Sequence, residues 1–171
     1  SINLGYWWDL NYPDPYISPF SGLSIACPGK ENQYLYFHQP VNTFFISEIL
    51  GVGPYGIYYS LIDMNANNGL GAVVSKNNLI TSEYNAGFGL TKTADNSGWW
   101  LVAGVHQSNI YHTYLIDSSG VSLHRIDTLG INIYENSEEE LVDQPGYSLF
   151  SPDGKQFARS DYWNGIAILD F

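Results

Sequence analysis

The sequence predicts an all-β protein built from four-stranded antiparallel blades of the β-propeller type. Three observations lead to this prediction. Aromatic residues are frequent (16%) and charged residues scarce (13%), a mixture that suits half-buried strands better than exposed helices. Short apolar or alternating runs follow one another along the chain, separated by turns rich in Gly, Asn, Asp and Pro.

The third observation is a repeat in which an aspartate ends the third strand of each unit. Asp63, Asp117 and Asp170 close similar apolar runs and stand 54 and 53 residues apart. Periods of roughly 40 to 50 residues with four strands each are typical of propeller blades. Because the last unit stops after its third strand, we expect about two and three-quarter blades.

Residues 1–21 are expected to form an extended lead-in, because Pro13, Pro15 and Pro19 remove backbone donors that a strand ladder needs. Blade 1 is assigned to residues 22–80. The segment 39–56 within it has no clear type. The four strands of blade 1 are expected at 23–27, 33–38, 57–64 and 72–80.

Blade 2 is assigned to residues 89–130 and an incomplete blade 3 to residues 146–171, with an acidic loop at 135–143 between them. Four to eight blades are typical of a closed propeller. We therefore expect a fragment of a longer polypeptide, or a chain completed by other chains; a compact sandwich is the alternative. The strands are expected at 89–93, 99–106, 110–116 and 121–129, then at 147–150, 156–160 and 166–171.

The edge of the last strand should be covered by continuing chain, by the N-terminal segment or by a neighbour, because an exposed apolar strand edge invites pairing. A net charge of -11 opposes binding to nucleic acid and to anionic membranes. No charged stretch is followed by the apolar run of a signal peptide, and no apolar run approaches the roughly eighteen residues of a membrane span, so neither a signal peptide nor membrane insertion is expected of this piece. The single cysteine, Cys27, is expected to be a buried, inert thiol.

Several short motifs resemble functional sites, but their surroundings argue against each one. Gly51–Gly56 matches GxGxxG, yet a β-branched and aromatic run follows it where a dinucleotide site needs a helix. Asp63–Asn67 resembles the start of a calcium loop but lacks the closing glutamate. Gly146–Phe150 begins like a nucleophile elbow without its final glycine. The four histidines have no metal-binding spacing and are expected to cap strands or face solvent, so no catalytic, cofactor or metal residue is assigned.

Exposed aromatic residues are the remaining candidates for ligand binding. Trp7, Trp8, Tyr162 and Trp163 could bind sugars or partner proteins, or they could fill the space between blades. The adjacent pair Trp99-Trp100 lies in an expected strand. One of these two rings should therefore pack between blades while the other points across the opposite face.

Two motifs are similar to those of a known group of proteins. Ser151-Pro152-Asp153-Gly154-Lys155, with Phe157-Ala158 after it, resembles a signature of WD40-like bacterial propellers. YYSLIDMNANNGLGAVVSKNNLI at 58–80 and LTKTADNSGWWLVAG at 90–104 look like the propeller region of large secreted Bacteroidota surface proteins. Those proteins carry type IX secretion sorting or gliding-motility-associated C-terminal domains, and the resemblance runs from about Gly22 onward.

The resemblance implies a non-catalytic scaffold or adhesion module, secreted or held at the bacterial cell surface. Its expected partners are proteins, glycans, or other copies or segments of the same protein that complete the propeller. Two alternatives stay open. The chain could be the accessory propeller of a hydrolase whose active site lies on another domain, or a carbohydrate-active enzyme, because its seventeen acidic residues offer many possible carboxylate pairs.

Overall fold

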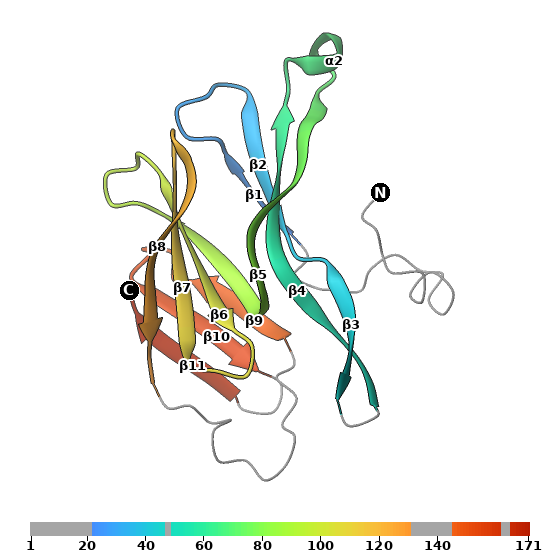
Figure 1. Ribbon diagram of the computed structural model, residues 1–171. Helices are drawn as coiled ribbons and strands as arrows, with labels where there is room; N and C mark the ends of the chain where they lie inside the picture. The colour runs from blue at the N-terminus through green and yellow to red at the C-terminus, as the bar shows by residue number, and fades with distance from the viewer. Residues whose placement is uncertain (1–21, 47–48, 131–144, 162–164) are drawn as a thin grey trace.

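The computed structural model describes residues 22–46, 49–130, 145–161 and 165–171 (Figure 1). These residues form antiparallel strands with one short helical turn, so the prediction of an antiparallel all-β chain is confirmed. The expected lead-in and acidic loop lie outside the described residues. The elements are β1 (Gly22–Ala26), β2 (Gln33–His38), β3 (Val41–Ile46), β4 (Ile49–Asp63), α2 (Ala66–Gly69), β5 (Ala72–Lys92), β6 (Trp99–Val105), β7 (Ile110–Asp117), β8 (Gly120–Thr128), β9 (Pro145–Phe150), β10 (Gln156–Asp161) and β11 (Gly165–Asp170).

Eight strands form one sheet in the order β1-β2-β4-β5-β6-β7-β8, with β3 paired to β4 as a side branch. β5 is long enough to serve two neighbours in turn. Residues 72–84 pair with β4, whereas residues 85–92 pair with β6. We call β1, β2, residues 55–63 of β4 and residues 72–81 of β5 the first unit, and residues 85–92 of β5 with β6, β7 and β8 the second unit.

Backbone irregularities mark the place where the sheet divides. The register between β4 and β5 shifts on both sides of Ile57, and the register between β5 and β6 shifts between Asn85 and Phe88. Gly56 has a φ of 67°, and a Cβ there would lie 2.8 Å from the Thr81 carbonyl oxygen. Bulges of this kind bend and twist a strand pair. β5 therefore leaves the first unit and enters the second without a loop.

The structure gives the segment 39–56 a definite form. β3 and the start of β4 pair as a hairpin, with Val41 opposite Pro54 and Ile46 opposite Ile49. The glycine-rich Gly51–Gly56 motif is part of β4, which begins at Ile49 rather than at the expected residue 57. Sequence patterns did not reveal this hairpin because its glycine and proline residues interrupt the alternation that indicates a strand.

The turn after β4 contains the helical turn α2. Asn67 and Asn68 have φ values of 55° and 56°, in the left-handed region that asparagine tolerates well. Asp63 accepts a hydrogen bond from the Asn65 amide at 2.8 Å, and the equivalent Asp117 accepts one from the Ser119 amide at 2.7 Å. Each of these repeated aspartates therefore begins the turn that leads to the fourth strand of its unit.

β9, β10 and β11 form a separate three-stranded sheet, the third sheet, in the order β11-β10-β9. It packs against the second unit (Figure 1). The runs at 57–63, 110–117 and 165–170 are each third in their own set of strands. The described sheets form an open arrangement and do not close into a ring.

The main hydrophobic core lies between the first and second units. Its residues alternate along the strands with residues of the opposite face, as a pleated strand requires. Partly buried side chains, including Cys27 and Trp99, pack against this core. The buried members are Ile25, Leu35, Phe37, Ile57, Phe88, Leu101, Ala103, Tyr114 and Ile116.

The second unit is covered on both faces. Trp99 packs against the main core, whereas the Trp100 ring lies on the opposite face, 4.8 Å from the His124 ring and 6.4 Å from the Phe171 ring. The prediction that these neighbouring rings point to opposite faces is confirmed. The first unit, the second unit and the third sheet thus form three successive layers, and among the described residues only the middle layer is covered on both sides.

Candidate functional site

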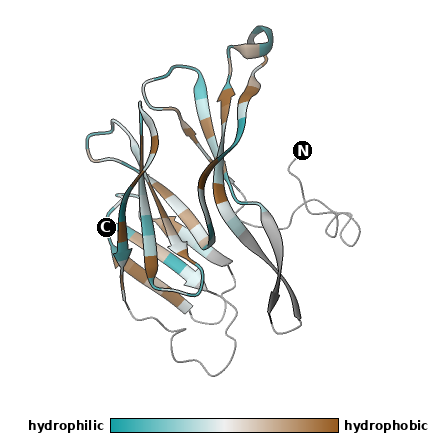
Figure 2. Cartoon of the chain, in the orientation of Figure 1, coloured by the Kyte–Doolittle hydropathy of each residue, from teal (hydrophilic) through white to brown (hydrophobic). Residues whose placement is uncertain are grey.

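The outward face of the third sheet carries large apolar side chains that the described residues leave uncovered. β10 turns Phe157 and Arg159 inward, where both are buried, so the intervening positions face outward. Figure 2 shows that β11 is largely hydrophobic along its length. The exposed fractions on this open face are 57% for Tyr147, 59% for Leu149, 71% for Ile166 and 65% for Ile168.

The register of the strands joins these side chains into one surface. Ala158 lies between Leu149 on β9 and Ile168 on β11, forming a row across all three strands. The Tyr147 amide donates to the Ser160 hydroxyl at 2.7 Å, and Ser160 lies opposite Ile166. Contiguous exposed apolar patches of this kind mark interaction surfaces in soluble proteins. We call this surface the third-sheet face.

The inward side of the third sheet is held by aromatic packing. The Phe157 ring lies 5.1 Å from the Phe150 ring and 6.2 Å from the Tyr111 ring. Gly89 on β5 permits this approach, because a Cβ there would lie 3.1 Å from the Phe157 ring and 3.3 Å from the Ser148 carbonyl oxygen. The third sheet is therefore fixed by its inner side, while the described residues leave its outer side open.

Arg159 adds a buried cation to the same contact. Its Nη1 donates to the Ser108 carbonyl oxygen at 3.1 Å, and its guanidinium lies 5.9 Å from the centre of the Tyr111 ring. Gly104 makes room for it, since a Cβ there would lie 3.0 Å from Nη1. These contacts join β10 to the turn after β6 and to β7.

A second open surface lies at the other end of the stack, on the outward side of the first unit. It contains a pocket of about 190 Å³. The His38 ring stacks between the rings of Tyr36 and Tyr58 at centroid distances of 5.8 and 5.9 Å. The pocket is lined by Tyr36, His38, Ser60, Ile62, Val73, Lys76 and Asn77. We call this surface the first-unit face.

His38 is a buried polar group in the wall of this pocket. Its residue is 5% exposed, and its Nδ1 has no hydrogen-bond partner among the described residues. Burial lowers the pKa of His38, because the charged imidazolium loses its hydration. The imidazole is therefore neutral at neutral pH, and its ring forms part of the pocket wall.

The opposite wall of the pocket carries a positive charge. Lys76 is one of only six lysine and arginine residues in a chain of net charge -11. Its neighbour Asn77 has a φ of 55° and donates its backbone amide to the Ser60 hydroxyl at 3.3 Å. This surface can therefore receive an apolar group against the rings and an acidic group against the ammonium.

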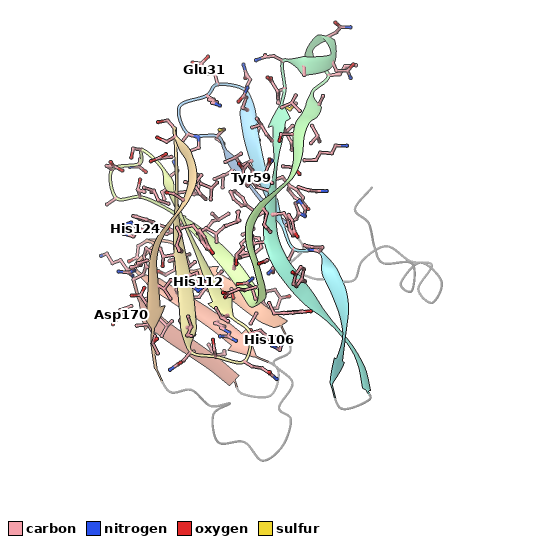
Figure 3. The ribbon with its side chains drawn as sticks, viewed as in Figure 1. Glu31, Tyr59, His106, His112, His124 and Asp170 are labelled. Atoms are coloured by element: carbon pink, nitrogen blue, oxygen red, sulfur yellow. The ribbon has the colours of Figure 1, made fainter. Side chains whose placement is uncertain are left out.

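Besides the two open faces, a cluster of polar side chains lies beside the main core, where β5 passes between the two units. The His112 Nε2 is 3.8 Å from the Glu83 carboxylate, and its Nδ1 is 3.4 Å from the Tyr114 hydroxyl. Figure 3 labels His112 and shows it within the body of the second unit. Burial raises the pKa of Tyr114, so its phenol is protonated at neutral pH. The geometry of this cluster suits a polar link between β5 and β7.

Two of the four histidines differ from their expected positions. They were expected to cap strands or face solvent, but His38 at the end of β2 and His112 within β7 are both buried, because neighbouring aromatic side chains pack against each ring. Figure 3 labels the other two, His106 after β6 and His124 on β8. Within the described parts of the chain, no three His, Cys, Asp or Glu residues gather as metal ligands would.

The aromatic residues predicted from the sequence to bind ligands, Trp7, Trp8, Tyr162 and Trp163, lie outside the described residues. Sequence reasoning missed both open faces. The alternation Tyr34, Tyr36, His38 was visible in the sequence, but a single strand pattern does not tell which face stays uncovered. Asp63, weighed as a calcium ligand, instead accepts hydrogen bonds from the Asn65 amide and from the Gln33 side chain at 3.1 Å.

Comparison with known protein families, with curated proteins and with solved structures found no match for this chain. In the described ranges, no helix has the length and hydrophobicity to cross a membrane. The geometry of the two open faces is therefore the basis for a functional interpretation.

Proposed function

We propose that the chain is a non-catalytic structural and binding segment of a β-propeller, made of two four-stranded blades and one three-stranded blade. In this proposal the first unit, the second unit and the third sheet are successive blades. The protein to which they belong is secreted or held at the cell surface of a bacterium, where it acts as a scaffold or adhesion module. Its binding surfaces are the third-sheet face and the first-unit face.

The observation that supports the proposal is the layering of the three sets of strands. Each set packs one side on the next, so the middle set is buried on both sides while each outer set leaves one apolar side open. Propellers are built from such radially repeated sheets. A two-layer sandwich would instead bury the inner face of each sheet and leave polar residues outside.

A crystal structure of the purified chain tests the architectural part. We expect three sheets arranged around a common axis, with β1, residues 85–92 of β5, and β9 nearest to it. Sheets that stack flat, without a common axis, would contradict the blade interpretation.

Incubation of the purified chain with a panel of polysaccharides tests the non-catalytic part. We expect that the chain releases no reducing sugar from any polysaccharide, whether or not it binds one. Turnover that survives removal of contaminating hydrolases would contradict the scaffold interpretation and favour the carbohydrate-active enzyme. Antibodies raised against the chain should label intact cells of the source bacterium or detect the protein in its medium.

A further inference from the structure

We infer that the third-sheet face docks onto the first-unit face of a second copy, so that two copies close head-to-tail into a ring of six layers. This inference rests on the proposed propeller architecture. It identifies the occupant of both open faces as the same chain. Each copy contributes one face to each of two equivalent contacts, as a two-fold symmetric pair requires.

Continuity with the packing inside the chain is the first argument. Two contacts between layers already exist, first unit on second unit and second unit on third sheet. Placing the first unit of a second copy on the third-sheet face repeats the same kind of contact. It would cover Leu149, Ile166 and Ile168, which are all more than half exposed in the single chain.

The number of layers is the second argument. Three layers per copy give six in a pair, which lies within the four to eight blades typical of closed propellers. Three copies would give nine, which lies outside that range. For copies that carry the three described layers, a pair is therefore the assembly that closes and covers both apolar faces.

The size of the faces is the third argument. Three strands of six residues cover roughly 20 Å by 14 Å, an area on the order of 300 Å² in projection. Stable interfaces bury about 800 Å² per partner. One such contact is too small for a firm dimer, but ring closure uses two contacts at once and brings the projected area to about 600 Å² per copy, which approaches that value.

The two faces also match in chemistry. The first-unit face exposes Tyr34, Val73 and Leu79 around its pocket, with Lys76 as its cation. The third-sheet face is apolar and bears Asp170, two residues beyond Ile168 on the same side of β11. Apolar surface thus meets apolar surface, and opposite charges meet rather than like ones, which favours this pairing over a contact between two identical faces.

Sedimentation equilibrium of the purified full chain tests the inference. We expect a mass of twice 19.1 kDa for the unaltered chain at micromolar concentration. Ile168→Lys on the third-sheet face and Leu79→Lys on the first-unit face should each weaken dimerisation by about tenfold or more, because each buries an ammonium in an apolar contact. Leu70→Lys is the matched control: Leu70 is 79% exposed beside α2, away from both faces, and its variant should stay dimeric.

The results for the two variants show which surface of a second copy covers the third-sheet face. Dimers in which Leu79→Lys is harmless and Ile168→Lys disruptive would mean that two third-sheet faces meet, which overturns the head-to-tail ring. A chain that remains a monomer, or grows into longer assemblies, also overturns it. A monomer whose crystal structure still has three sheets around a common axis would leave the proposed function standing. The exposed positions of all three substitutions favour folded variants, which near-ultraviolet circular dichroism verifies.

Discussion

Asp95 and Asp153 occupy the same position in two turns that share one hydrogen-bond pattern. Each carboxylate accepts from the hydroxyl two residues earlier at 2.7 Å, and from the backbone amide two residues later at 3.0 Å for Asp95 and 3.2 Å for Asp153. The next residue is left-handed in both, with φ values of 59° at Asn96 and 71° at Gly154. These turns join the first two strands of the second unit and of the third sheet, so the repeat extends to individual hydrogen bonds.

The first prediction concerns the acidity of Asp95. Hydrogen bonds from Thr93 and Ser97 lower the pKa of Asp95 to about 2 from the ordinary 3.8. Since the folded pKa is the lower one, the resulting stabilisation is present above pH 3.8 and is lost as the pH falls through about 2. Thr93→Ala should raise the pKa of Asp95 toward 3.8, measured by an NMR titration of the carboxyl carbon. Thr128→Ala, at the end of β8, is the control and should leave the titration unchanged.

Much of the strand order was predictable from the sequence, because it depends on local patterns. The repeated aspartates at the ends of third strands form the turns that their spacing implied, as the Asp63 and Asp117 contacts show. Trp99 and Trp100 point to opposite faces because adjacent residues of any strand do so. Strands and turns were therefore predictable because each depends on residues that are close together in the sequence.

What could not be predicted depends on contacts between distant residues. β5 passes continuously from one unit to the next because of bulges near Gly56 and Phe88. The alternation of apolar and polar residues in one sequence does not reveal such shifts in strand pairing. The burial of His38 and the exposure of Ile168 depend on which face of a sheet another layer covers. Both open faces therefore required the three-dimensional arrangement.

The second prediction concerns the contact between the second unit and the third sheet. Phe157 is 1% exposed and packs against Phe150, Tyr111 and Gly89. Phe157→Ala should lower the free energy of unfolding by about 3 to 5 kcal/mol, because it removes a buried ring and leaves a cavity. Urea denaturation measures the change. Leu149→Ala, on the open side of the same sheet, should lower the free energy of unfolding by much less at concentrations where the chain is monomeric, and equal losses there would contradict the assigned inner and outer sides.

The third prediction separates a buried arginine from an exposed one. Arg159→Met keeps most of the side-chain volume but leaves the Ser108 carbonyl oxygen without its charged donor. We expect a loss of about 1.5 to 3 kcal/mol in the free energy of unfolding. Arg125 pairs with Asp127 at 2.7 Å on the surface, where such pairs contribute about 0 to 1 kcal/mol, so Arg125→Met is the control. A larger loss for Arg125→Met would contradict the role given to Arg159.

The fourth prediction concerns the pH dependence of stability at the first-unit face. Burial lowers the pKa of His38 below its unfolded value of 6.5, so the unfolded chain takes up this proton first as the pH falls. The contribution of His38 to stability is therefore complete above pH 6.5 and decreases below it, until the folded pKa is reached. His38→Gln should make the urea midpoint less sensitive to pH between about 7.5 and about 5, a window in which surface carboxylates are largely ionised.

The matched control for this measurement is His124→Gln, because His124 is exposed on β8 and lies away from the pocket. The unaltered chain and His124→Gln should lose stability to a similar extent as the pH falls, while His38→Gln loses less. Equal pH dependence in all three proteins would mean that His38 is hydrated in the folded chain. It would then not be the buried, neutral wall of the pocket, and the first-unit face would have to accept a partner without it.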